Sequence, residues 1–135
     1  MYATQADMVK RYGESDIIAL TDREHLTGAI VVETLQAAIA DAVNLIHGYL
    51  GKRYKLPLNP VPPLATRWTV ELARWFLQPN SAPEQVKANF ERAIEELKAA
   101  RDGDLSLDAE EASPLFSGTA ELVGPERIFE KMNGF

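Results

Sequence analysis

The sequence contains no cysteine and only two histidines among its 135 residues. Without cysteine there is no disulfide bond, no thiolate metal site and no cysteine nucleophile, and the composition fits a reducing compartment. His25 and His47 belong to no His-Glu-x-x-His or His-x-Glu arrangement, so the sequence holds no ligand set for a hydrolytic zinc ion. We therefore predict no metal site, no bound cofactor and no catalytic residue.

Long apolar runs and an excess of basic residues are lacking as well. No run of about 18 apolar residues occurs, and the N-terminus has neither a basic start nor an apolar segment, so we expect neither membrane insertion nor secretion. Residues 1–101 carry 12 acidic and 12 basic side chains, whereas residues 102–135 carry 8 acidic and 2 basic ones. A neutral body with an acidic tail has no basic stripe for a phosphate backbone, so we expect no tightly bound nucleic acid.

What the sequence does contain is helical periodicity. Two short helices are predicted, over residues 5–12 and from residue 14 or 15 to 20, with Gly13 between them. A polar loop follows, and a central helix is predicted from about Val32 to Tyr54. Its apolar face consists of Leu35, Ile39, Val43, Ile46 and Leu50.

Two more helices are predicted after a proline-rich, extended connector over residues 55–63. The first begins at Pro63 and stops before Pro79. It carries an apolar stripe (Leu64, Trp68, Leu72, Trp75) and a charged stripe (Arg67, Glu71, Arg74). The second is expected to start with a capping box formed by Ser81 and Glu84 and to end at Gly103. The pattern therefore predicts an all-α domain over residues 1–103, a small bundle of three main helices plus two short N-terminal ones.

An extended acidic C-terminal tail is predicted over residues 104–135. Residues 104–124 are acidic and poor in large apolar side chains, so we predict a mobile linker there. Apolar residues return in the last ten positions, which we predict to be a docking segment for another protein chain. Its interacting residues would be Arg127, Ile128, Phe129, Met132 and Phe135. The alternative is that this segment folds back onto the helices of its own chain.

A basic cluster interleaved with tyrosines follows the central helix. It contains Lys52, Arg53 and Lys55 beside Tyr49 and Tyr54. Such a cluster can contact nucleic acid. We favour a cationic helix end that complements the helix dipole or an acidic protein surface, with Lys52 and Arg53 as protein-interaction residues.

The loop after residue 20 partly matches a calcium-binding loop. Asp22, Glu24 and Glu33 occupy its first, third and twelfth positions, but Leu26 stands at the fifth and the sixth is not glycine. We therefore predict a polar interhelical loop. The alternative is a metal-dependent protein or an enzyme centred on Asp22, Glu24 and His25.

A series of short motifs runs through nearly the whole chain. They are Met1-Tyr2-Ala3-Thr4, Arg11-Tyr12-Gly13-Glu14, Leu20-Thr21-Asp22-Arg23, Ala40-Asp41-Ala42, Gly48-Tyr49-Leu50, Arg53-Tyr54, Leu56-Pro57-Leu58, Ala73-Arg74, Arg127-Ile128-Phe129 and Gly134-Phe135. In this order they resemble a family of Mu-like prophage proteins of tailed phages, which is similar in turn to head-tail connector (adaptor, head completion) proteins. Where many members resemble an acidic Asp-x-Asp-Gly loop, this chain has Glu24-His25-Leu26-Thr27, which argues against a metal-binding role.

The resemblance implies an α-helical structural protein of the virion that is not an enzyme. Such a protein assembles as a ring, expected to be twelvefold, under the portal at the head-tail junction. Its implied partners are further copies of itself, the portal protein and a tail-completion protein, with only weak contact to passing DNA, no membrane, and the host cytoplasm as its place during assembly. The alternative function is a small helical nucleic-acid-binding module that uses Lys52, Arg53 and Lys55.

Overall fold

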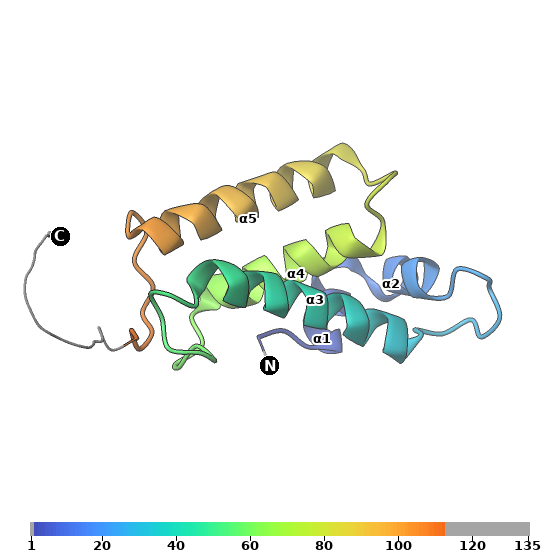
Figure 1. Cartoon of the computed structure of the whole chain (residues 1–135). Coiled ribbons are helices and arrows are strands. Elements are labelled where there is room, and N and C mark those ends of the chain that lie inside the picture. The colour runs from blue at the N-terminus through green and yellow to red at the C-terminus, as the bar shows by residue number, and fades with distance from the viewer. Residues whose placement is uncertain (1, 113–135) are drawn as a thin grey trace, which may run out of the picture.

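Residues 2–112, the part of the chain that the computed structural model describes, form five α-helices. The helices are α1 (Gln5–Tyr12), α2 (Glu14–Thr21), α3 (Val32–Leu50), α4 (Pro63–Leu77) and α5 (Glu84–Asp102). The three long helices lie side by side, each antiparallel to the one before it in the chain, while α1 packs against α4 and α2 against α3 (Figure 1). This arrangement confirms the predicted all-α bundle. None of these five helices is long and apolar enough to cross a membrane.

The hydrophobic core lies between the three long helices. The predicted apolar face of α3 is buried along its whole length, at Leu35, Ile39, Val43, Ile46 and Leu50. Trp68 of α4 is fully buried, and Trp75 stacks on Phe90 of α5 with ring centroids 4.7 Å apart. Burying an apolar side chain of this size stabilises the fold by about 1.5–3 kcal/mol. The assignment of the core face is therefore confirmed.

Local chemistry sets the ends of the two short helices. The Thr4 hydroxyl accepts a hydrogen bond from the Asp7 backbone N–H, and the Asp7 carboxylate accepts one from the Thr4 N–H, so α1 begins with a reciprocal cap. Gly13, with a φ of 89°, separates α1 from α2 in a conformation that other residues rarely adopt. The helix α2 continues to Thr21, whose hydroxyl donates to the Ile17 carbonyl at 2.8 Å.

The C-terminal end of α3 differs from the prediction. The helix ends at Leu50 and does not reach Tyr54. Tyr54 instead forms an isolated antiparallel bridge with Glu111, and the Lys55 N–H donates to the Glu110 carbonyl at 3.0 Å. This pairing needs extended backbone at Tyr54, so that residue cannot belong to α3. A contact between segments far apart in the sequence therefore makes the helix shorter than its local pattern predicts.

Residues 104–112 belong to the predicted mobile linker, but they pack against the helical body, so the prediction is wrong for them. Gly103, with a φ of 90°, turns the chain back beside Arg53. Leu107 is buried, and its N–H donates to the Tyr54 hydroxyl at 3.0 Å. This packing was hard to predict from the sequence, because the stretch is acidic and contains only two leucines. One of them, Leu107, adds to the core. Residues 113–124 of the predicted linker lie outside the described residues.

The start of α5 also differs from the prediction. The helix begins at Glu84, and Pro83 precedes it without any side-chain cap. Ser81 accepts a hydrogen bond from the Gln78 side chain and does not cap the helix. If Ser81 were the N-cap, Ala82 would be the first helical residue. Ala82 precedes Pro83, and helical backbone angles are disfavoured for a residue before proline. The predicted capping box is therefore wrong.

Candidate functional site

A buried carboxylate surrounded by arginines joins three helices. Glu71 of α4 is 1% exposed and forms ion pairs with Arg11 of α1 at 3.0 Å, Arg67 at 3.2 Å and Arg92 of α5 at 2.8 Å. The sequence predicted a charged stripe on α4 but not its burial. The burial follows from the position of α4, which contacts α1, α3 and α5 and so has little solvent-facing surface.

The same network continues to Glu96 of α5. Its carboxylate accepts hydrogen bonds from Arg67 at 2.6 Å and from the Trp68 indole at 2.9 Å. Desolvation raises the pKa of Glu96, but the hydrogen bonds from Trp68 and Arg67 outweigh it and hold the pKa below its usual value. Both oxygens of the Glu71 carboxylate and one of Glu96 accept hydrogen bonds from side chains of the bundle, so this charged cluster joins α1, α4 and α5.

A second polar contact fastens the N-terminus to α3. The Tyr2 hydroxyl lies 2.7 Å from Nε2 of His47 and accepts a hydrogen bond from the Leu58 N–H at 2.8 Å. The two rings meet edge to face, with centroids 5.4 Å apart. Burial lowers the pKa of the His47 imidazole, because desolvation disfavours its charged form. His47 is thus a partly buried residue in the last turn of α3.

The loop between α2 and α3 is organised by Asp22. This carboxylate is 5% exposed and accepts backbone hydrogen bonds from Leu26 at 3.1 Å, Thr27 at 3.2 Å and Gly28 at 2.8 Å. These bonds, that of Gly28 first, hold the pKa of the Asp22 carboxyl below its usual value. The Asp22 carboxylate is thus engaged by the backbone of its own loop, and the segment between α2 and α3 is an interhelical loop, as predicted. His25, with a φ of 56°, lies exposed in this loop.

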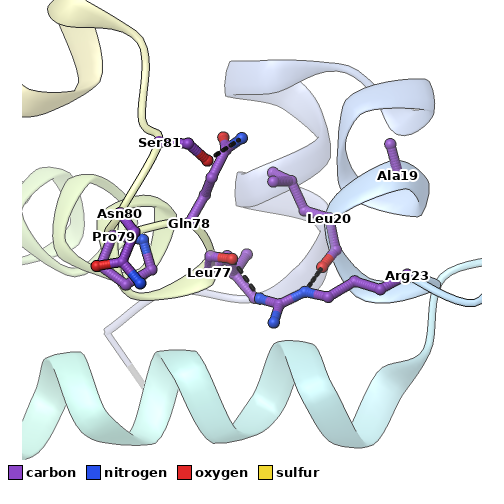
Figure 2. Close-up of a pocket in the computed structure, with 8 residues that line it drawn as sticks. All are labelled: Ala19, Leu20, Arg23, Leu77, Gln78, Pro79, Asn80 and Ser81. Carbon is purple, nitrogen blue, oxygen red and sulfur yellow. Dashed lines mark hydrogen bonds between the residues drawn. The ribbon is translucent and has the colours of Figure 1, made fainter.

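Arg23 fixes the base of this loop to the rest of the bundle. Figure 2 shows its guanidinium reaching the backbone carbonyls of Leu20 and Leu77, at the C-terminal ends of α2 and α4. A cation at these helix ends is favoured because the last carbonyls carry partial negative charge. Beside it lies a hollow of about 340 Å³, lined by Ala19, Leu20, Arg23, Leu77, Gln78, Pro79, Asn80 and Ser81 (Figure 2).

The loop presents a large apolar side chain to solvent. Leu26 is 78% exposed, and a second hollow of about 360 Å³ lies beside it. That hollow is lined by Thr21, Asp22, Arg23, Glu24, Leu26, Thr27 and Val31. An exposed apolar side chain on a fixed loop, flanked by two hollows, is a candidate protein-interaction site. Sequence reasoning missed it, although a lone leucine in a polar loop was the available signal.

The predicted basic cluster is only partly available to a partner. The Arg53 guanidinium donates to the Arg101 carbonyl in the last turn of α5 at 3.2 Å, and Lys55 lies 3.7 Å from Glu110. Tyr54 is buried, whereas Lys52 is exposed. Arg53 thus complements the C-terminus of α5, whereas the predicted cationic end was that of the central helix. The choice between a protein partner and nucleic acid at Lys52 and Arg53 stays a prediction.

The predicted docking segment lies outside the described residues. This applies to Arg127, Ile128, Phe129, Met132 and Phe135. Asp22, Glu24 and His25, the alternative metal or catalytic group, fall in one loop, and no group of three or more His, Asp or Glu side chains placed to hold a metal ion occurs among residues 2–112.

Comparison with known proteins shows what the chain resembles. The family model described as "Bacteriophage Mu, Gp36" matches residues 2–122. The Mu-like prophage FluMu protein gp36 of Haemophilus influenzae is 36% identical over 110 residues, which cover 79% of this chain and 75% of the relative. Gene product J of Escherichia phage Mu is 30% identical over 138 residues, which cover 99% of this chain and 98% of the relative.

Proposed function

The chain belongs to the bacteriophage Mu Gp36 family and is thus a phage structural or morphogenesis protein, and from this premise we propose that it is a head-tail connector. In this role it assembles as a ring under the portal and links the DNA-filled head to the tail. Its partners are neighbouring copies of itself, the portal protein and a tail-completion protein. The proposal assigns it no catalytic step.

The observation that carries the proposal is the position of exposed apolar side chains at the two ends of α3. Leu26, 78% exposed, precedes the helix, and Val61, 43% exposed, follows it. A helix of 19 residues spans about 28 Å, and the loops that hold these two residues lie at opposite ends of the bundle (Figure 1). A subunit in a ring needs two different surfaces for its two neighbours, which this arrangement supplies.

The rigidity of the Leu26 loop also suits an assembly contact. The Asp22 carboxylate and the Arg23 guanidinium tie the loop to its own backbone and to the end of α4. A loop that is already ordered loses little conformational entropy when it binds. A leucine held in this way can contribute more of its burial energy to an interface than one on a mobile loop.

The charge distribution supports a channel that DNA passes without being held. Residues 1–101 are neutral overall, and the excess of acidic side chains begins after them. Affinity for DNA depends on the number of phosphates neutralised by basic residues, so such a body binds the duplex weakly. Arg53 and Lys55, which the nucleic-acid alternative would use, already contact Arg101 and Glu110.

The proposal gives the remaining predicted residues a place. Lys52 lies exposed next to Arg53, just after the C-terminal end of α3, where it can contact an acidic patch of a partner. The C-terminal docking segment, with Ile128 and Phe129 at its start, serves a neighbouring subunit or the portal.

Deletion of the gene in its phage tests the function directly. We expect DNA-filled heads and complete tails to accumulate separately, and a plasmid copy of the gene to restore joined particles. Immunogold labelling of joined particles should mark the head-tail junction. Loss of head filling, absence of tails, or label at the tail tip would contradict the connector role.

A pair of loop variants tests the assembly surface. Leu26→Asp should abolish particle joining, because a charge replaces the exposed apolar contact. Ala29→Asp adds the same charge to the same loop without removing a large apolar side chain, so it should join normally. Both purified variants should melt as the wild type does. Equal joining by the two variants would remove Leu26 from the interface.

A further inference from the structure

At the edge of the buried face of α3 lies a hollow that the proposed function does not use. It measures about 240 Å³ and lies where the N-terminal residue Ala3 meets the helix. The hollow is lined by Ala3, Gln36, Ile39, Ala40, Val43 and Asn44. Four of these six side chains are apolar and none is charged, whereas both hollows next to Arg23 include a charged side chain.

The size and chemistry of this hollow indicate what it can accept. Pockets for small-molecule ligands usually measure about 300–1,000 Å³ and contain several directed polar groups, so this one is too small and too apolar for such a ligand. It fits one or two apolar side chains of a peptide. Gln36 and Asn44, eight residues apart on α3, leave amide groups at its two ends for the polar groups of that peptide.

We propose that the occupant is the C-terminal docking segment, residues 126–135, of the same chain. Its residues Ile128, Met132 and Phe135 stand at positions i, i+4 and i+7. This spacing places three apolar side chains on one side of a short helix, which is the pattern of segments that bind in a groove beside another helix. The segment folds on the α3 hollow when it binds.

The length and starting point of the undescribed chain favour this occupant. Ala112 donates its N–H to the Arg53 carbonyl, so the chain leaves the body next to the C-terminal end of α3. Ala40 lies ten residues before Leu50, or about 15 Å along the helix axis. The linker of 13 residues, 113–125, has a typical end-to-end distance of about 20 Å if flexible. A linker whose span matches the separation gives an effective concentration in the millimolar range, well above that of a second copy in dilute solution.

This inference concerns the free chain and does not depend on the connector role. In the free subunit the segment covers the α3 hollow, and it must leave this hollow before it can bind a neighbouring copy or the portal. A neighbouring copy carries an identical hollow, so in an assembled ring the C-terminal segment of one copy can bind the hollow of the next.

Disulfide cross-linking tests the proposal, since the natural chain has no cysteine that could interfere. The full-length variant Ala40→Cys/Gly134→Cys is oxidised with diamide at micromolar concentration. The matched control is Glu91→Cys/Gly134→Cys, because Glu91 is exposed on α5 and lies eleven residues before the end of that helix. If the segment binds the hollow with a dissociation constant of about 0.1 mM, the first variant should form an intrachain disulfide about tenfold faster than the control.

A second pair of variants ties this rate to the apolar contact. Adding Met132→Ser to the Ala40→Cys/Gly134→Cys chain should lower the rate to that of the control, whereas Asn133→Ser should leave it unchanged. Circular dichroism of each variant checks that the helical body is intact. Equal rates at Ala40 and Glu91, or no effect of Met132→Ser, would overturn the proposal. A disulfide-linked dimer as the main product would overturn it in favour of a second copy. None of these results bears on particle joining, so the connector role is tested separately.

Discussion

Replacing Glu71 with alanine should destabilise the helical body by about 3 kcal/mol. Glu71 is the only carboxylate within salt-bridge distance of both Arg11 and Arg92 among the described residues, and it also pairs with Arg67. Its removal leaves three positive charges close together, at the place where α1, α4 and α5 meet. The variant therefore loses three attractions, and the repulsion between Arg11 and Arg92 is no longer offset, whereas Arg67 keeps its pair with Glu96.

The magnitude follows from how much of each partner is exposed. Removing one member of a fully buried ion pair costs about 3–5 kcal/mol, because the other charge is left without compensation. Here the side chains of Arg11, Arg67 and Arg92 are 38%, 30% and 51% exposed, so water can replace part of what they lose. The lower end of that range, about 3 kcal/mol, is therefore expected.

Urea unfolding followed by circular dichroism measures this effect. With an m-value of about 1.5 kcal/mol/M, the midpoint should fall by about 2 M. Glu95→Ala is the matched control, because Glu95 is 74% exposed and, within residues 2–112, its one ion pair is with Lys98 at the surface. Such a surface pair contributes less than about 1 kcal/mol. A Glu71→Ala midpoint equal to that of Glu95→Ala would refute the view that the buried cluster clamps the helices.

Three further predictions follow from the fold and its charges. Ile39→Asp should abolish the cooperative unfolding transition seen by circular dichroism, because an unpaired carboxylate would enter the core; a fully helical variant would contradict the assigned face. The melting temperature should fall from pH 7.5 to 5.5, because the pKa of His47 is lower in the folded than in the unfolded protein. The stability that neutral His47 contributes is complete above the unfolded pKa of about 6.5 and is lost as the pH falls through the folded pKa. His47→Gln should flatten this dependence and His25→Gln should not. The full chain should show no submicromolar affinity for duplex DNA at physiological salt in gel-shift assays; binding that is lost in Lys52→Ala/Arg53→Ala would support the nucleic-acid alternative.

The helices themselves could be predicted because local patterns determine them. The spacing of Leu35, Ile39 and Leu50 defines the buried face of α3, and Gly13 separates the two short helices. The prediction failed where distant segments meet. Tyr54 leaves the helical pattern because its backbone pairs with Glu111, a contact between residues far apart in the sequence.

Burial of charge was equally hidden from the sequence. The spacing of charged residues on α4 resembles that of a solvent-facing stripe, and only the packing of α1 and α5 against that helix makes Glu71 a core residue. Likewise, the carboxylate of Asp22 matched the first position of a calcium loop. The backbone turn that brings the N–H groups of Leu26 and Gly28 onto this carboxylate depends on geometry that residue types alone do not specify.

Two of the motifs behind the family resemblance contain residues that hold the fold together. Functional differences between related chains are therefore to be sought at other positions. Arg11 binds Glu71, and Arg23 caps two helices. The segment Glu24-His25-Leu26-Thr27 forms the loop tip that exposes Leu26. Asp22 holds this loop through backbone N–H groups, and Arg23 binds two backbone carbonyls, so the side chains at the tip can change at little cost to the fold. We therefore predict that side-chain substitutions within residues 24–27, Leu26 above all, change binding at this end of the molecule and leave the melting temperature unchanged.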